Sequence, residues 1–315
     1  MNILITGASG FLGSHLMSAL KGKGHTLVLL DSKVCDLTKV DSLRKFDDLR
    51  YDQIFHLAAW TQAGDFCLYH PGEQWIINQK INTNVLSWWS EKQPQAKLIA
   101  IGTSCSYPPD RILEEKNYLE GQPIDSLFTY AMTKRMLHVG LLSLQKQYGL
   151  KYLNLVPSTL YGPDYHTDER QMHFIFDLIL KIIRGKKYGE QVILWGDGYQ
   201  RRELVYVHDF VNIAIKISQS VDNDIVNIGA GEDYSIREFA KIICDIVEFD
   251  FEQIQFDTTK YTGAKSKCLN IKKLKKIIPD IKLLDIHLGI ERTIKWFNDS
   301  YFKDSNHITR INNVT

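Results

Sequence analysis

The stretch that decides the fold is residues 3–13, Ile-Leu-Ile-Thr-Gly-Ala-Ser-Gly-Phe-Leu-Gly. Its three apolar residues predict a short buried strand, and residues 12–20 continue with the pattern of a helix. Gly7, Gly10 and Gly13 lie in the turn between the two, where they permit a tight bend and a close approach of backbone to a pyrophosphate. Amides and the positive dipole at the N-terminus of the helix also favour such an anion. We therefore expect a dinucleotide to bind here.

The side chains near this turn predict which dinucleotide is held. Asp31 ends a second predicted strand, residues 26–30, eighteen positions after Gly13. A carboxylate at this place can accept hydrogen bonds from both ribose hydroxyls of NAD and would repel the 2′-phosphate of NADP. Ser9 and Ser32 stand where an NADP enzyme would favour arginine. NAD is therefore the expected cofactor, although Lys33 nearby could weaken the preference.

The rest of the expected cofactor site comes from three short segments. Phe11 and Leu12 open the first helix, and Asp36 and Leu37 are expected beside the adenine. A third strand is expected at residues 54–59. It ends in three small or apolar residues over which the cofactor can pass, which are Leu57, Ala58 and Ala59.

Strands and helices alternate along the first half, which predicts an α/β fold with a Rossmann-type, doubly wound parallel sheet. Its further strands are expected at residues 98–101 and 152–156. The character of the sequence changes after Pro157, and we expect residues 1–158 to form the NAD-binding domain, with 204–227 returning to it. Residues 159–315 then form mainly a smaller lobe. In this lobe we expect strands at residues 192–195, 203–207 and 226–228, helices at 174–183, 236–247 and 286–298, and a disordered tail from 305.

Composition excludes several classes of protein. Of the 315 residues 44% are hydrophobic and 24% charged, as in globular proteins, and the net charge of +1 does not demand a nucleic-acid partner. No apolar run reaches the length of about 18 residues that a membrane span needs, and no leader sequence is evident. The five cysteines are scattered and odd in number, which indicates reduced thiols in a cytoplasm, with no metal site.

Two polar clusters are candidates for catalysis. Tyr130 and Lys134 are four residues apart and share one face of a predicted helix, where the ammonium would favour the phenolate. Such a phenol can exchange a proton with a sugar hydroxyl while a hydride moves at the same carbon. Thr103 follows a strand at the end where ligands bind in doubly wound sheets, and it is placed to bond the reacting hydroxyl, with Ser104 as the alternative.

These features together resemble those of the extended short-chain dehydrogenase/reductases that act on nucleotide sugars. The resemblance rests on the three loop glycines, the Leu-Ala-Ala at residues 57–59, Thr103, Tyr130 and Lys134, the Leu-Tyr-Gly-Pro at 160–163 and the Arg-Glu-Leu-Val-Tyr-Val-His-Asp at 202–209. It spans nearly the whole chain. It implies an NAD(P)-dependent enzyme, a second lobe that binds a nucleotide sugar, and a homodimer formed through the helices around residues 84–89 and 130–144.

Within this family the sequence most resembles the GDP-fucose synthase group, whose members are epimerase-reductases for GDP-4-keto-6-deoxymannose. Gly-Thr-Ser-Cys-Ser-Tyr-Pro at residues 102–108 is similar to a motif of that group. The resemblance implies that Cys105 and His173 are an epimerisation pair, and that Trp195, Arg202 and Lys267 contact a GDP-linked sugar. Thr159 stands where the group has a substrate-binding asparagine.

Departures from the pattern leave several functions open. Ser9 and Ser32 replace the group's NADP-binding arginines, and Thr103 replaces its catalytic serine. We expect hydride transfer at C4 of a nucleotide sugar, with or without epimerisation at C3 and C5. A C4 epimerase with tightly bound NAD is an alternative, as is a non-catalytic NAD-binding scaffold. A dehydratase is disfavoured because Ser104 and Cys105 stand where its acidic residues would be.

Overall fold

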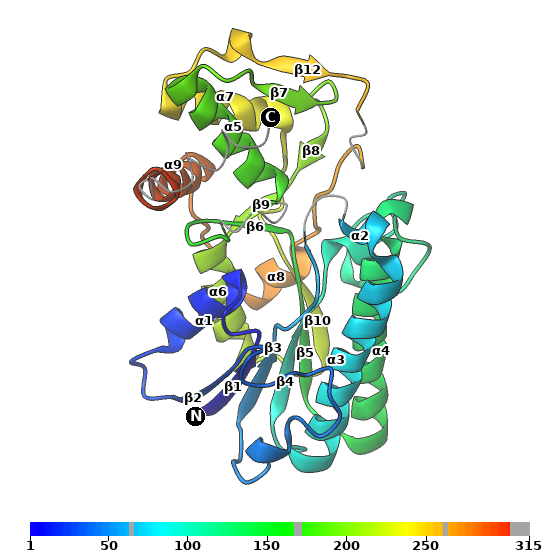
Figure 1. Ribbon diagram of the computed structural model, residues 1–315. Coiled ribbons are helices and arrows are strands. Elements are labelled where there is room, and N and C mark those ends of the chain that lie inside the picture. The colour runs from blue at the N-terminus through cyan, green and yellow to red at the C-terminus, as the bar shows by residue number, and fades with distance from the viewer. Residues whose placement is uncertain (63–65, 167–171, 261–263, 303–315) are drawn as a thin grey trace.

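The computed structural model describes residues 1–62, 66–166, 172–260 and 264–302. A parallel six-stranded sheet with strand order β10-β5-β4-β3-β1-β2 forms its centre (Figure 1). The strands are β1 (Asn2–Thr6), β2 (Thr26–Leu30), β3 (Gln53–His56), β4 (Lys97–Ile101), β5 (Tyr152–Pro157) and β10 (Asp224–Ile228). All of them run in the same direction, and sequence order reverses at β1, which confirms the predicted doubly wound sheet.

Helices cover both faces of this sheet. One face packs against α1 (Phe11–Leu20), α6 (Val207–Ser218) and α8 (Lys272–Ile277), in a core that includes Leu16, Phe210 and Leu274. The other face packs against α3 (Pro71–Lys92) and α4 (Phe128–Tyr148), through residues such as Trp89 and Leu137. The strands are therefore buried on both sides, which explains why they are apolar without alternation.

The strand register brings the carboxyl ends of four strands to one edge of the sheet. Thr6 is opposite both Leu30 and His56 in its neighbours, and His56 is opposite Ala100. The turns that follow these strands consequently meet at this edge.

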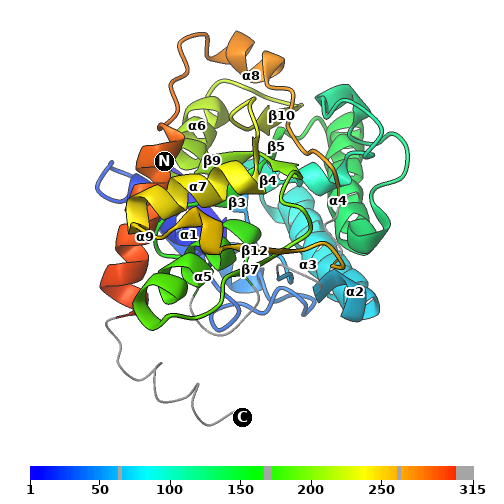
Figure 2. The same cartoon turned by 90° about the horizontal axis from the view of Figure 1, so that it is seen from above.

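A smaller lobe stands above this edge of the sheet (Figures 1 and 2). Its core packs α5, α7 and α9 together, with Phe176, Phe239 and Phe297 fully buried. The elements outside the main sheet are α2 (Phe66–Tyr69), β6 (Thr159–Tyr161), α5 (Phe174–Tyr188), β7 (Ile193–Trp195), β8 (Arg201–Arg202), β9 (Leu204–Tyr206), β11 (Tyr234–Ser235), α7 (Ile236–Val247), β12 (Gln255–Asp257) and α9 (Ile286–Trp296).

Several predicted boundaries were wrong by a few residues. The third strand ends at His56, three residues early, because the main-chain amides of Leu57 and Ala58 turn to the Thr6 hydroxyl. Val207 opens α6 instead of ending a strand, and β7 begins one residue later than expected. The last predicted helix stops at Trp296 and continues as a wider turn, Phe297–Tyr301. The predicted disordered tail from residue 305 lies outside the described residues.

The helices and the position of β10 bear on two predictions, that the chain has no membrane span and that it divides near residue 158. None of the helices in the described segments is long and apolar enough to cross a membrane. Strand β10 lies beside β5 in the main sheet, and α6 packs on α1. The division of the chain at residue 158 remains a prediction.

Candidate active site

The loop between β1 and α1 is a cradle built from glycines. Gly7 has a φ of +69°, and the Gly10 amide donates to its carbonyl at 3.1 Å. A Cβ added to Gly13 would lie 2.2 Å from the Gly7 carbonyl oxygen, and one added to Gly7 would lie 2.9 Å from the Ala58 amide. Only glycine fits these places, so the turn is held tight against β3. Its shape suits a pyrophosphate at the N-terminus of α1.

Asp31 follows β2 beside this loop. One of its carboxylate oxygens accepts the main-chain amides of Lys33 and Val34, both at 2.9 Å. These bonds fix the carboxylate and leave its second oxygen for a further donor. Ser9 and Ser32 are both exposed, and because serine is uncharged neither supplies a cation near Asp31. The arrangement fits a ribose diol better than a phosphate.

The residues expected at the adenine have more structural roles than the sequence indicated. Asp36 is exposed, and its carboxylate accepts the hydroxyl and amide of Thr38, which lower its pKa. Leu37 is only 6% exposed and packs into the core behind the sheet, where Asn84 also bonds its carbonyl. Its side chain is therefore a core residue first. Leu57, Ala58 and Ala59 are half-buried in the turn after β3.

Thr103 and Tyr130 meet at the edge of the sheet. Thr103 follows β4, is 7% exposed, and its hydroxyl accepts the Cys105 amide at 3.2 Å. Burial raises the pKa of Tyr130, the charge of Cys105 raises it further, and the Thr103 hydroxyl opposes both. This differs from the expectation that Lys134 would favour the phenolate. The phenol is protonated near neutral pH and is thus a proton donor.

Lys134 lies one helical turn after Tyr130 and is 5% exposed. Burial lowers its pKa to about 8, so the ammonium is retained at neutral pH and lost in mild base. Its charge reaches His56, whose ring lies between Thr6 at 2.9 Å and Asn82 at 3.1 Å. The Asn82 amide in turn contacts the Thr133 carbonyl on α4. This chain of contacts ties the sheet edge to the helix that carries both Tyr130 and Lys134.

Two residues that the sequence analysis did not single out fix the segment after β4. Tyr118 is 1% exposed, and its hydroxyl accepts the Thr103 amide at 3.4 Å and the Ser106 hydroxyl at 3.2 Å. Arg135 is 6% exposed and donates to the carbonyls of Ser106, Glu120 and Gly121. Arg135 directly follows Lys134, but only its burial reveals this role.

Cys105 lies beside Lys267, a contact that the sequence did not indicate. The ammonium Nζ is 2.8 Å from the Sγ of Cys105. Burial would raise the pKa of Cys105, but the charge and hydrogen bond of Lys267 outweigh it, with help from Thr103 and Arg202, and the pKa falls below its usual value. Lys267 was expected at a diphosphate, and here it also contacts a candidate catalytic thiol.

His173 occupies the N-cap position of α5, where its side chain makes no capping hydrogen bond, and the residue is exposed. The protein atoms around its ring lower its pKa to about 4, and the charges of Lys267 and His166 contribute. The ring is therefore neutral at neutral pH. Lys267 thus acts electrostatically on both members of the expected epimerisation pair.

Of the other expected substrate residues, Ser104 and Arg202 line one cavity with Cys105 and Lys267, whereas Trp195 and Thr159 do not line it. Arg202 donates to the carbonyls of Arg201 and Ala264, both at 2.7 Å. Ser104, Cys105, Arg202 and Lys267 line a cavity of about 140 Å³. Trp195 is 56% exposed at the end of β7, so its indole is not part of the core. Thr159 is half-buried on β6.

Comparison with known proteins agrees with this geometry. A GDP-L-fucose synthase of Dictyostelium discoideum is 28% identical over 310 residues, covering 95% of this chain and 96% of its own. A GDP-L-colitose synthase of Yersinia pseudotuberculosis is 27% identical over 94% of this chain and 98% of its own. The crystal structure of a GDP-L-fucose synthetase from Naegleria fowleri bound to NADP matches with a TM-score of 0.85 and 24% identity, covering 96% of this chain and 93% of that one.

A family model supplies the assignment. The model of the NAD dependent epimerase/dehydratase family matches residues 3–229, which run from β1 to just beyond β10 and include the glycine cradle, Thr103, Tyr130 and Lys134. The matched segment therefore carries both the dinucleotide fold and the candidate groups for proton transfer. The chain belongs to the NAD dependent epimerase/dehydratase family, the extended short-chain dehydrogenase/reductases, and is an enzyme of the nucleotide-sugar reductase and epimerase type.

Proposed function

We propose that the enzyme transfers a hydride at C4 of a GDP-linked manno-type or deoxy sugar and epimerises C3 or C5 of its 4-keto form. The observation that carries this proposal is the convergence of Thr103, Tyr130 and the Lys267-paired Cys105 at one edge of the sheet. Hydride transfer needs the first two, whereas proton removal beside a ketone needs a base such as the third. The resemblance to GDP-sugar epimerase-reductases supports the same substrate class.

The chain's own groups account for the proton at C4. Tyr130 is a neutral phenol and donates its proton to the C4 oxygen during reduction, while Thr103 hydrogen-bonds that oxygen. Lys134 keeps its charge below about pH 8 and holds the ribose hydroxyls of the cofactor. The bound nicotinamide cofactor supplies or accepts the hydride.

Epimerisation uses a second pair of groups. Cys105 removes a proton from the carbon beside the ketone, where the negative charge is delocalised into an enolate. His173 returns a proton to the opposite face by donating its ring N–H while its other ring nitrogen takes a proton from water. Arg202, Trp195, Thr159 and Ser104 are proposed to hold the nucleotide sugar, with Arg202 matched to the diphosphate by its planar guanidinium.

NAD is the proposed cofactor, although the Naegleria structure binds NADP. Asp31 is fixed by two main-chain amides and has one oxygen left for a ribose hydroxyl. The 2′-phosphate of NADP would meet this carboxylate with no arginine at Ser9 or Ser32 to offset it. The cradle residues Gly7, Gly10, Phe11, Leu12 and Gly13 would hold the pyrophosphate.

A C4 epimerase that retains NAD is the second candidate. Asp31 favours it, because this carboxylate fits the ribose of NAD. An epimerase that keeps NAD needs only Thr103, Tyr130 and Lys134, and it leaves Cys105 and His173 without a chemical role. The two candidates differ in whether the cofactor leaves oxidised after each turnover.

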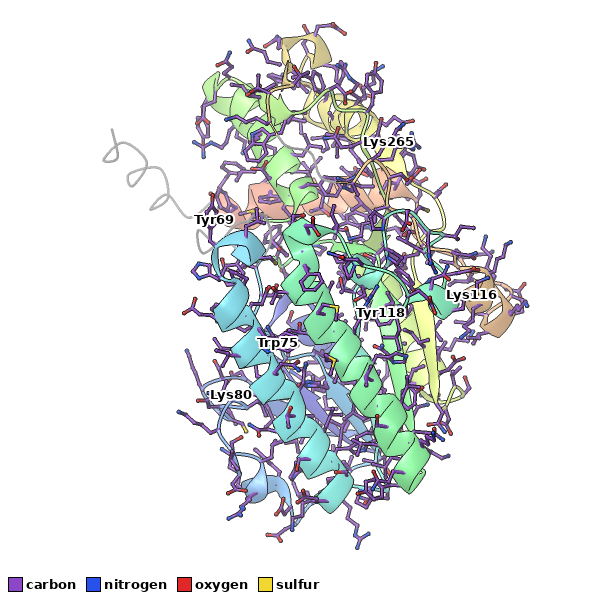
Figure 3. All side chains as sticks on the ribbon, turned by 90° about the vertical axis from the view of Figure 1, so that its right-hand side faces the viewer. Tyr69, Trp75, Lys80, Lys116, Tyr118 and Lys265 are labelled. Carbon is purple, nitrogen blue, oxygen red and sulfur yellow. The ribbon has the colours of Figure 1, made fainter. Side chains whose placement is uncertain are left out.

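The proposed assembly is a homodimer through α3 and α4, which run side by side on one face of the molecule (Figure 3). Trp75, Ile76, Met136, Val139 and Leu142 are 36–54% exposed on these helices. Trp88 and Trp89, expected on this surface, are instead buried in the core. All five cysteines are free, which supports a reducing, cytoplasmic location.

Incubation with GDP-4-keto-6-deoxymannose and either NADH or NADPH tests this proposal. The expected result is loss of reduced-nicotinamide absorbance, faster with NADH, together with deuterium incorporation at C3 or C5 in heavy water. Deuterium entry should be lost in Cys105→Ser, a variant that keeps both Tyr130 and Lys134. Turnover of this sugar without exchange above the spontaneous rate would leave a C4 oxidoreductase alone, and no turnover of any GDP-sugar would refute the proposal.

A further inference from the structure

Lys267 is held in place by the segment that carries it. The Arg201 amide donates to the Lys265 carbonyl at 2.9 Å, and the Ser266 hydroxyl donates to Asp233 at 2.8 Å. The Leu269 amide donates to the buried carboxylate of Glu203 at 2.9 Å. With bonds on both sides of it, the segment that carries Lys267 is fixed beside the site, and its ammonium reaches Cys105.

The partner of this ammonium is a thiol that is only partly exposed. Cys105 is fixed from the other side, because its amide donates to the Thr103 hydroxyl. The Nζ of Lys267 donates a hydrogen bond to the Sγ of Cys105 at 2.8 Å. An ammonium stabilises a nearby thiolate far more than it stabilises a neutral thiol.

Among the described residues, the other charged and titratable groups around Cys105 do not supply an equivalent cation. Arg202 on β8 contributes less than Lys267 does, and its guanidinium is bonded to the carbonyls of Arg201 and Ala264. Tyr130 on α4 and Cys67 on α2 also face the thiol, and both would oppose a second negative charge. Lys267 is therefore the group that decides the charge of Cys105.

We propose that Lys267 is a positioning residue whose ammonium, in contact with the Sγ of Cys105, favours the thiolate of that cysteine in the resting enzyme. Its use in epimerisation rests on the proposed function, but the contact itself does not. The proposal adds to the expected diphosphate contact of Lys267 a role in setting the protonation of Cys105.

The test measures how fast iodoacetamide alkylates Cys105 in the apo protein as a function of pH, with the modified peptide identified by mass spectrometry. In the wild type the midpoint of the rate–pH profile should lie below that of the same cysteine in the urea-unfolded chain. Lys267→Met should raise this midpoint, and a midpoint that is higher by one pH unit lowers the thiolate fraction near neutral pH about tenfold. Lys267→Arg should keep the midpoint low.

Lys265→Met is the matched control, because it removes the same charge from the same segment without a contact to Cys105 in the described residues. It should leave the midpoint unchanged. Lys267→Gln provides a second variant in case methionine disturbs folding, which circular dichroism checks. An identical midpoint in the wild type, Lys267→Met and Lys267→Gln would overturn the proposal. A wild-type midpoint equal to that of the unfolded chain would also overturn it.

The test uses neither a sugar nor a cofactor, so its failure is distinguishable from failure of the proposed reaction.

Discussion

Gly13→Ala tests the glycine cradle most severely. The added Cβ would lie 2.2 Å from the Gly7 carbonyl oxygen and 2.8 Å from two atoms of Ala8. Because real contacts of this kind essentially never fall under 3.0 Å, the loop and helix must separate by about 0.8 Å (3.0 − 2.2). All the opposing atoms belong to the backbone, so no side chain can rotate away.

The expected cost follows from overpacking of this kind, about 1–3 kcal/mol, less the 0.5–1 kcal/mol that alanine gains over glycine in a helix. Because only backbone opposes the added Cβ, the upper end of the overpacking range applies, and we expect a net loss of about 2 kcal/mol in the free energy of unfolding, measured by urea titration. The displaced amides should weaken NAD binding about tenfold or more in calorimetry, since charge-assisted hydrogen bonds contribute about 1.5–3 kcal/mol.

Gly72→Ala is the matched control for this substitution. Gly72 is also in the first turn of a helix, and an added Cβ there would meet no atom within 4 Å. This variant should be as stable as the wild type or slightly more stable, with unchanged NAD affinity. A Gly13→Ala protein that behaves like Gly72→Ala in both assays would refute the cradle.

Three further predictions concern the cofactor, the pH dependence of stability and the assembly. Asp31→Ala should weaken NAD binding and reduce the difference in affinity between NAD and NADP. Calorimetry that shows tighter NADP binding by the wild type would contradict the role given to Asp31. His56 and His138 are 1% and 4% exposed and burial lowers the pKa of each to about 4, so they contribute stability above pH 6.5 that is lost as the pH falls towards 4, up to about 3 kcal/mol each. His138→Phe should flatten the pH dependence of urea unfolding between pH 4 and 6.5, and an unaltered slope would count against a buried neutral ring. Met136→Glu with Val139→Glu should convert a dimer to monomers in sedimentation, whereas Leu288→Glu on the exposed side of α9 should not, and a wild-type monomer would exclude the interface.

The sheet was predictable from the sequence because its strands are continuous apolar runs buried on both faces, such as residues 98–101. The ends of the strands were less predictable. The strand at residues 54–59 was overextended because its apolar composition continues to Ala59, while its end is set by the Thr6 hydroxyl, which is distant in sequence. The short helix α8 and the small strands β8, β11 and β12 depend on tertiary packing and carry no strong periodic signal.

In the candidate site, too, local patterns were predictable from the sequence and contacts between distant residues were not. The glycine turn and the Tyr130–Lys134 pair are local patterns, so their presence and spacing could be recognised directly. The pairing of Lys267 with Cys105 joins residues 162 positions apart and is invisible in the local sequence. Leu37, expected near the adenine, proved to be a core residue because the segment after β2 folds back onto α3.

The protonation of Tyr130 could not be predicted from its spacing to Lys134. The four-residue interval places the two on one helix face, but burial and the charge of Cys105 raise the pKa of the phenol. The balance between a neighbouring cation and desolvation depends on how deeply each group lies, which the sequence does not specify.

The most direct test of the proposed chemistry is a single-turnover measurement of hydride transfer to C4. NADH deuterated at its transferable position is mixed with a GDP-4-keto sugar, and the C4 deuterium of the product is followed in the wild type, Tyr130→Phe and Lys134→Met. We predict transfer to C4 in the wild type, a loss of about 10²–10⁴-fold in Tyr130→Phe with cofactor affinity preserved, and losses of both rate and affinity in Lys134→Met. Deuterium at another carbon, or normal transfer by Tyr130→Phe, would contradict the proposed roles of these residues.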